Sequence, residues 1–200
     1  MNDEDSTGQF DFGKVFSCSL DLISTESDRG AVLVSASLLE HNLERAIKKR
    51  LLPTTDKADK LFGGAMAPLS TFSGRIEMAF RLGIITKESK QMLTIFRGIR
   101  NDMAHNFNFS SFEDQSVKAR LQNAFKEQKE THEKVLYVKR EAIRTILEER
   151  GSSLGFDARL LDDEWPMRQI FNYFFALIAT ELEMLVGEIS EVSRQSDTSG

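Results

Sequence analysis

The stretch ESDRGAVLVSASLLEHNLERAIKKRLLP, residues 26–53, contains the signals of one complete long helix. Its apolar residues recur at the three- and four-residue spacing that places side chains on one face of an α-helix. They are Val32, Leu39, Leu43, Ala46 and Ile47. Lysine and arginine fill the last turn, where the helix dipole favours positive charge, and Pro53 follows the end. The stretch therefore predicts an amphipathic helix with one buried face.

The same periodicity recurs on both sides of this stretch, and no segment shows convincing strand alternation. Gly83 is placed to end a helix and Thr86 to begin the next, while Ser111 with Asp114 predicts a capping box. Predicted helices cover residues 12–24, about 70–82 and 87–105, a segment starting at 111, and a long C-terminal stretch from 166 to 189. The fold class is therefore predicted as all-α, a helical bundle with short connections and a long C-terminal helix.

Length and composition favour a single domain. Two hundred residues with 40% hydrophobic content are enough to bury one core. Polar, small residues at 1–8 and 194–200 predict flexible tails around one helical domain, residues 9–193. Within it, segment 126–150 is heavily charged, and KEQKETHEK at 126–134 is most simply interpreted as solvated.

The charge and cysteine content disfavour several function classes. Acidic residues outnumber basic ones 31 to 26, and a net charge of -5 offers no general attraction to nucleic-acid phosphates, so direct DNA binding is not expected. One cysteine and three scattered histidines predict neither a disulfide framework nor a zinc site, and no metal or cofactor is expected. The acidic N-terminus does not resemble a signal peptide, and the most apolar window, 170–179, is about half of a membrane span. A cytoplasmic protein without a membrane segment is expected.

The stretch IFRGIRNDMAHNF, residues 95–107, carries the main candidate site. Arg97, Asn101 and His105 follow one another at four-residue spacing opposite an apolar stripe, and Arg100 lies at the margin. One interpretation is the solvated face of an amphipathic helix. The other is an anion-binding or catalytic site, because arginine binds phosphate or carboxylate through paired hydrogen bonds and histidine transfers protons near neutral pH.

Four aromatic residues in the last predicted helix also have two interpretations. Phe171, Tyr173, Phe174 and Phe175 occupy four of five successive positions and cover more than one helix face. They are predicted either to fill the core of the bundle or to form an interface with a second chain.

Three blocks of the sequence resemble the mannitol operon repressor (MltR-like) family over roughly residues 12–125. These blocks are ESDRGAVLVSASLLEHNLERAI, PLSTFSGRIEMAFRLGIIT and FRGIRNDMAHNFNFSSFEDQ, in this order. The resemblance implies a helical regulator of transcription, repressor-like, that lacks a recognisable DNA-reading helix and acts through partners. The recurrence of the first block suggests that Glu26 or Arg29 lines the same ligand or partner pocket as Arg97 and Arg100.

A second resemblance lies inside the third block. The spacing of Arg100, Asn101 and His105 is similar to the motif of HEPN-type ribonucleases, which implies metal-independent RNA cleavage by a dimer. In that role His105 would deprotonate the 2′-hydroxyl, Arg100 would stabilise charge on the phosphate and Asn101 would orient them. On a straight helix, however, five residues separate Arg100 and His105 by about 140°. Catalysis would then require a break in the helix or groups from a second chain.

Three functions therefore remain open from the sequence. The preferred one is an MltR-like regulator that self-associates as a homodimer and binds a protein or a small anion. The second is a metal-independent endoribonuclease acting on RNA. The third is a non-enzymatic dimeric scaffold in which the arginine, asparagine and histidine only fasten the bundle.

Overall fold

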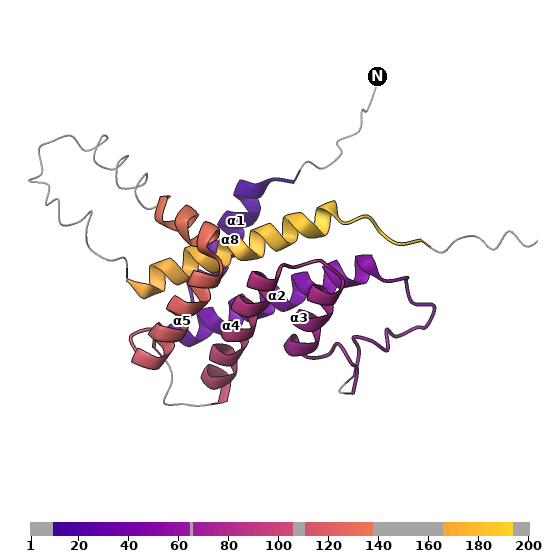
Figure 1. Cartoon of the computed structure of the whole chain (residues 1–200), viewed down its shortest axis with the longest axis horizontal. Helices are drawn as coiled ribbons and strands as arrows, with labels where there is room; N and C mark the ends of the chain where they lie inside the picture. The colour runs from indigo at the N-terminus through magenta and orange to yellow at the C-terminus, as the bar shows by residue number, and fades with distance from the viewer. Residues whose placement is uncertain (1–9, 65, 106–110, 138–165, 194–200) are drawn as a thin grey trace, which may run out of the picture.

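The computed structural model describes residues 10–64, 66–105, 111–137 and 166–193, which contain helices and turns but no strand. The all-α prediction is confirmed. The helices are α1 (Phe12–Ser24), α2 (Asp28–Arg50), α3 (Phe72–Arg81), α4 (Lys87–His105), α5 (Gln115–Glu127) and α8 (Met167–Glu188), shown in Figure 1. Residues 129–137 are also helical. The predicted tails, 1–8 and 194–200, lie outside the described residues.

Local hydrogen bonds explain where several helices begin and end. The hydroxyl of Ser27 accepts from the backbone N–H of Gly30 at 3.1 Å and starts α2. Thr86 likewise accepts from the N–H of Ser89 at 3.2 Å, so its predicted role at the start of α4 is confirmed. Gly83 follows α3 with φ of 66°, the left-handed conformation that glycine adopts most easily, as predicted.

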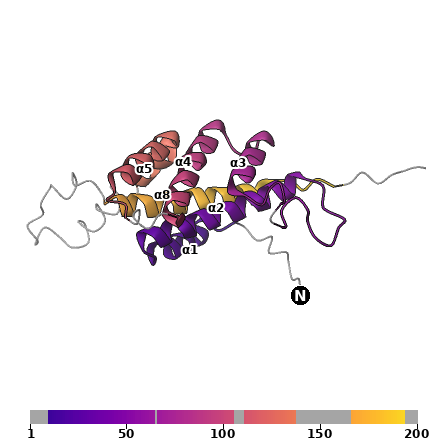
Figure 2. The same ribbon diagram turned by 90° about the horizontal axis from the view of Figure 1, so that it is seen from below.

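Helices α2 and α8 form the centre of the bundle and run parallel to each other. Three contacts connect them, from Asp28 to Arg168, from Asn42 to the carbonyl of Ala179 at 3.0 Å, and from Arg45 to Glu183. From one contact to the next the residue number increases in both helices, so the two helices run in the same direction. The remaining helices pack around this pair: α1 lies on one side, and α3, α4 and α5 form a row on the other (Figures 1 and 2).

Aromatic side chains fill the middle of the core. Phe171, Phe174 and Phe175 are each 0% exposed, and the ring centroids of Phe175 and Phe96 are 4.1 Å apart. These three phenylalanines belong to the interior of a single chain, so their prediction as an interface is wrong. Tyr173 is partly buried with its ring 6.1 Å from that of Phe16 on α1. Helix α8 is covered on more than one side because α1, α2 and α5 all pack against it.

Two predictions about the middle of the chain are wrong. Helix α5 starts at Gln115, after Asp114, whose side chain makes no capping hydrogen bond. Ser111 instead accepts from the N–H of Glu113 at 3.1 Å, within the turn before the helix. The charged segment is also not simply solvated, because the helical residues 129–137 bury Thr131 and Val135. The part of this segment from 138 to 150 lies outside the described residues.

Helix α8 is long and apolar enough to cross a membrane by length and composition, so the expectation that its apolar run was too short is wrong. It is the only such helix in the described part of the chain. About 61% of its apolar window is buried inside the bundle. That burial is what the central helix of a compact soluble-type fold requires, since neighbouring helices cover its apolar side chains.

Candidate functional site

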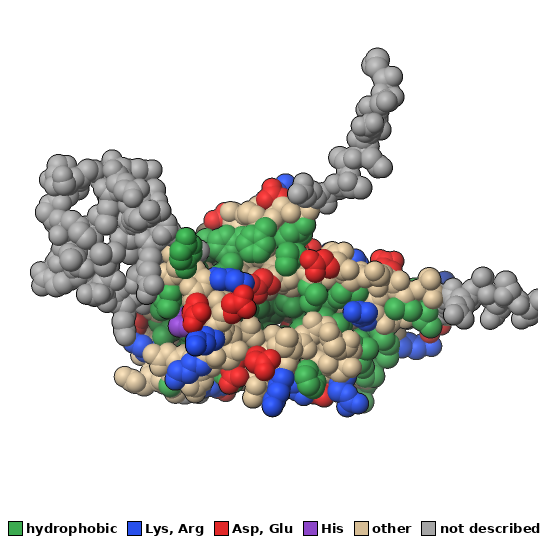
Figure 3. Space-filling model, turned by 45° about the horizontal axis from the view of Figure 1, so that its top comes forward, with side chains coloured by type: hydrophobic (Ala, Val, Ile, Leu, Met, Phe, Trp, Pro, Cys, Tyr) green, Lys and Arg blue, Asp and Glu red, His purple; other side chains and the backbone are tan. Residues whose placement is uncertain are grey.

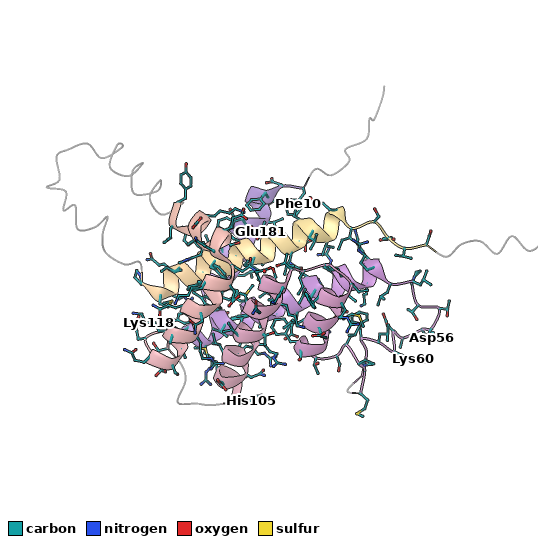
Figure 4. All side chains as sticks on the ribbon, in the orientation of Figure 1. Phe10, Asp56, Lys60, His105, Lys118 and Glu181 are labelled. Carbon is teal, nitrogen blue, oxygen red and sulfur yellow. The ribbon has the colours of Figure 1, made fainter. Side chains whose placement is uncertain are left out.

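The polar side chains of α4 point to different surroundings. Asn101 and His105 are exposed, and His105 is the last residue of the helix, at the end remote from α8 (Figure 4). Arg97 and Arg100 are partly buried one turn apart. The predicted cluster is therefore divided, with two arginines against the bundle and two residues facing solvent.

Arg100 is directed toward α2. Its Nη2 lies 3.9 Å from Oε1 of Glu40, and its Nη1 donates to the side-chain oxygen of Asn101 at 3.2 Å. Glu40 also lies 3.8 Å from Nη1 of Arg75 on α3. This carboxylate is shared between two guanidinium groups, which joins α2, α3 and α4.

The same charge network extends along α2 to Glu44. Nη2 of Arg75 lies 2.7 Å from Glu44, and Lys48 lies 2.5 Å from it on the other side. Burial raises the pKa of the Glu44 carboxyl, but the hydrogen bond from Lys48 and the charge of Arg75 outweigh it, so the pKa lies below its ordinary value. Glu44 is therefore an ionised structural group near neutral pH.

Two guanidinium nitrogens in this region lack partners. Nε of Arg97 and Nε of Arg100 are both buried and have no hydrogen-bond partner among the described residues. Buried donors without partners are uncommon and often mark places where a water or ion binds. The sequence periodicity predicts Arg97 on the solvated face of the helix, whereas in the structure its side chain is partly buried.

Arg100 and His105 do not converge within one chain. Helix α4 continues unbroken to His105, so the two side chains leave it about 140° apart. Arg100 is also turned toward Glu40, whereas His105 faces solvent. Residues 106–110, which follow His105, lie outside the described part of the chain.

Glu26 and Arg29 are not placed beside Arg100. Glu26 lies just before α2 and Arg29 in its first turn, and Arg29 is 11 positions before Glu40, which corresponds to about 16 Å along a helix. The backbone carbonyl of Glu26 accepts from Nη2 of Arg168 at 2.7 Å. Glu26 and Arg29 thus belong to the corner between α1 and α2, whereas Arg97 and Arg100 face the middle of the bundle.

Arg168 is a central residue of that corner that sequence analysis missed. Its guanidinium binds Asp28 at 3.0 Å and the carbonyl oxygens of Ile23, Ser24 and Glu26. Asp28 in turn accepts from the N–H of Phe112 at 2.9 Å. Nothing in the local pattern around Arg168 indicates these contacts, because each of these hydrogen-bond partners is 140 or more residues away in the sequence.

The outer face of α2 remains apolar and partly exposed. Its side chains border a shallow hollow of about 310 Å³. They are Leu33, Val34, Ser37, Leu38 and His41. No lysine, arginine or carboxylate lines this hollow, which distinguishes it from the charged network around Glu40 and Glu44.

The described residues offer no group of three or more histidine, cysteine, aspartate or glutamate side chains arranged to hold a metal ion. Comparison of the chain with known protein families, with curated proteins and with solved structures found no match. The site must therefore be interpreted from its own geometry.

Proposed function

We propose that this protein is a cytoplasmic regulatory binding protein that associates with a second copy of itself and acts on transcription through a protein partner. The observation that carries the proposal is the uncharged apolar face of α2. The MltR-like blocks supply the regulatory context, and each of these three blocks contributes one of the helices that meet at Glu40.

The composition of the α2 face suits self-association. In a twofold dimer the same surface meets its own copy, so like charges in the centre of the interface would repel. The hollow bordered by Leu33, Val34 and Leu38 contains no formal charge. Apolar side chains grouped on a partly exposed helix favour burial against another surface.

The overall charge argues for a protein partner over DNA. The chain carries a net charge of -5, and the arginines of α4 face Glu40 on α2 or are partly covered. Neither arrangement provides a row of free cations for a phosphate backbone. Tight, salt-sensitive binding of the purified protein to promoter DNA would contradict this part of the proposal.

Replacement of Leu38 by glutamate tests the α2 face. A charge placed in the centre of a twofold interface opposes its own copy, so Leu38→Glu is expected to sediment as a monomer at concentrations where the wild type associates. Leu61→Glu is the matched control, because Leu61 is 42% exposed and lies in the loop after α2, away from this face. A wild type that stays monomeric at all concentrations would refute self-association.

A metal-independent endoribonuclease is the second candidate, favoured by the exposed pair Asn101 and His105. They lie one turn apart on the same helix face, and Asn101 is held by Nη1 of Arg100. Because Arg100 and His105 diverge within the chain, this activity needs groups from a second copy.

Incubation of the purified protein with total and structured RNA in EDTA tests the ribonuclease. If RNA is cleaved, His105→Ala and Arg100→Ala are expected to abolish cleavage, while the control Arg81→Ala, at an exposed position outside both the α4 site and the α2 face, retains it. Unchanged RNA with well-folded wild-type protein would leave the α4 residues as a binding or structural group and refute the enzymatic alternative.

A further inference from the structure

A groove between α1, α8 and the helical residues 129–137 forms a second partly apolar surface, separate from the α2 face. Its volume is about 590 Å³. The lining side chains are Phe12, Glu130, Glu133, Lys134, Tyr137, Leu177, Glu181 and Met184. Figure 3 shows hydrophobic side chains gathered on the face that carries α1, with acidic side chains close to them.

The apolar side chains of this groove are incompletely covered by the described part of the bundle. Phe12 is 40% exposed and Tyr137 is 63% exposed. Helix α1, to which Phe12 belongs, buries only Ser19 and Ile23 of its 13 residues, although more than half of them are apolar. A helix this apolar is normally covered on most sides, so a further helix fits beside it.

The border of the groove is acidic. Three carboxylates, from Glu130, Glu133 and Glu181, face one ammonium group, that of Lys134. Lys134 lies 3.3 Å from both Glu130 and Glu181, so it is already shared between two of these carboxylates. Glu133 is 3.8 Å from Lys129, which lies outside the groove. The lining therefore has an excess of two negative charges, three carboxylates minus one ammonium.

We propose that this groove binds a basic amphipathic helix of a partner protein. The inference rests on the proposed function and names the chemistry of the partner. Apolar side chains of the incoming helix would cover Phe12 and Tyr137, while its lysine or arginine residues would face Glu130 and Glu133. A second copy of this chain fits less well, because a twofold contact would bring two acidic borders together.

Two synthetic amphipathic peptides test the groove. They share one length and one leucine stripe, and their polar faces carry either lysine or glutamate. Binding of each fluorescently labelled peptide to the full chain is measured by anisotropy. We expect the basic peptide to bind and the acidic one not to bind, with Kd rising as salt is added. Reversing two exposed charges with Glu130→Lys and Glu133→Lys is expected to raise Kd at least about tenfold.

A control with the same change in net charge separates the groove from general attraction. Glu113→Lys with Glu191→Lys reverses two exposed acids that do not line the groove and is expected to leave Kd within about twofold. Equal weakening by this control, equal binding of both peptides, or no binding at all would overturn the proposal. The proposal would also be overturned if the protein were a dimer that the substitutions Glu130→Lys and Glu133→Lys dissociate.

The variant Leu38→Glu on α2 separates the peptide-binding test from the self-association test. Leu38→Glu is expected to lose self-association and still bind the basic peptide, because Leu38 does not line the groove. Self-association without peptide binding would retain the α2 interface and reject the groove. Peptide binding without self-association would retain the groove and reject the α2 interface.

Discussion

The guanidinium of Arg168 binds both ends of the turn between α1 and α2. Its Nη2 donates to the carbonyls of Ile23 and Glu26, and its Nη1 binds the carboxylate of Asp28 at the first turn of α2. Backbone carbonyls at a helix end otherwise lack partners, so one side chain satisfies groups that the helix itself leaves open. Arg168 thereby ties the start of α8 to the hairpin of α1 and α2.

Removal of this side chain is expected to lower the stability of the whole bundle. Arg168→Ala removes one donor from Asp28 and from each carbonyl, and a hydrogen bond to a charged group contributes about 1.5–3 kcal/mol net of the competing hydrogen bonds to water. We expect the free energy of unfolding in urea to fall by about 2–4 kcal/mol. The control Arg81→Ala removes an exposed arginine and is expected to change it by less than about 0.5 kcal/mol. Equal midpoints for the two variants would contradict the role of Arg168.

His132 gives the fold a dependence on pH. Its ring is partly buried against Phe125, with centroids 5.5 Å apart. Burial lowers the pKa of His132 from its ordinary value of 6.5, although the charge of Glu133 opposes this shift. The unfolded chain therefore binds more protons than the folded one between the folded and unfolded pKa values, and stability rises with pH across that window.

The expected result is a loss of stability as the pH falls from above 6.5 through the lowered pKa of His132. In His132→Gln this part of the pH dependence should disappear, whereas His41→Gln, at an exposed position, should keep it. Urea unfolding at several pH values measures both. A wild type that is more stable at the acidic end of the window would show that the sign is wrong.

Helix α3 depends on a close approach to the loop before it. A β-carbon at Gly74 would lie 2.6 Å from the carbonyl oxygen of Pro68, which is backbone and moves only with the loop. The loop is held in place by Arg75, whose Nε donates to the carbonyl of Leu69 at 2.9 Å. Alanine normally stabilises a helix more than glycine does, but at position 74 the steric clash opposes that preference.

A pair of glycine substitutions separates the two effects. Gly74→Ala is expected to lower the free energy of unfolding by about 1–3 kcal/mol, because the loop must shift to admit the methyl group. Gly187→Ala in the last turn of α8 meets nothing within 4 Å and is expected to raise it by up to about 1 kcal/mol. Thermal unfolding of the two variants provides the comparison, and stabilisation by Gly74→Ala would contradict the proposed packing.

For the molecule as a whole, local sequence patterns predicted those features of the fold that depend on residues close together in the sequence. The boundaries of α1, the cap of α4 at Thr86 and the extent of α8 follow from local spacing and capping preferences. The parallel contact of α2 with α8 and the partners of Arg168 depend on residues about 140 positions apart, which no local pattern encodes. The division of the α4 site likewise depends on Glu40, a residue of another helix.

The aromatic centre of the molecule provides a test that separates core from interface. Phe175 is 0% exposed, and its ring centroid lies within 5.2 Å of those of Phe96, Phe171 and Phe174. Phe175→Ala is therefore expected to lower the free energy of unfolding by about 3–5 kcal/mol, through lost burial and the cavity left behind. Leu22→Ala, at a 53% exposed position, should change it by less than about 0.5 kcal/mol.

Unfolding followed by two spectroscopic probes and at several protein concentrations then shows whether Phe175 is a core residue or an interface residue. Because all described helices share one core cluster, helix content by far-UV circular dichroism and aromatic packing by near-UV circular dichroism should be lost together in both variants. A core residue lowers stability equally at all protein concentrations, whereas an interface residue lowers it only where the chains associate. A loss confined to high concentration would return Phe175 to an interface, and separate transitions would divide the chain into more than one folding unit.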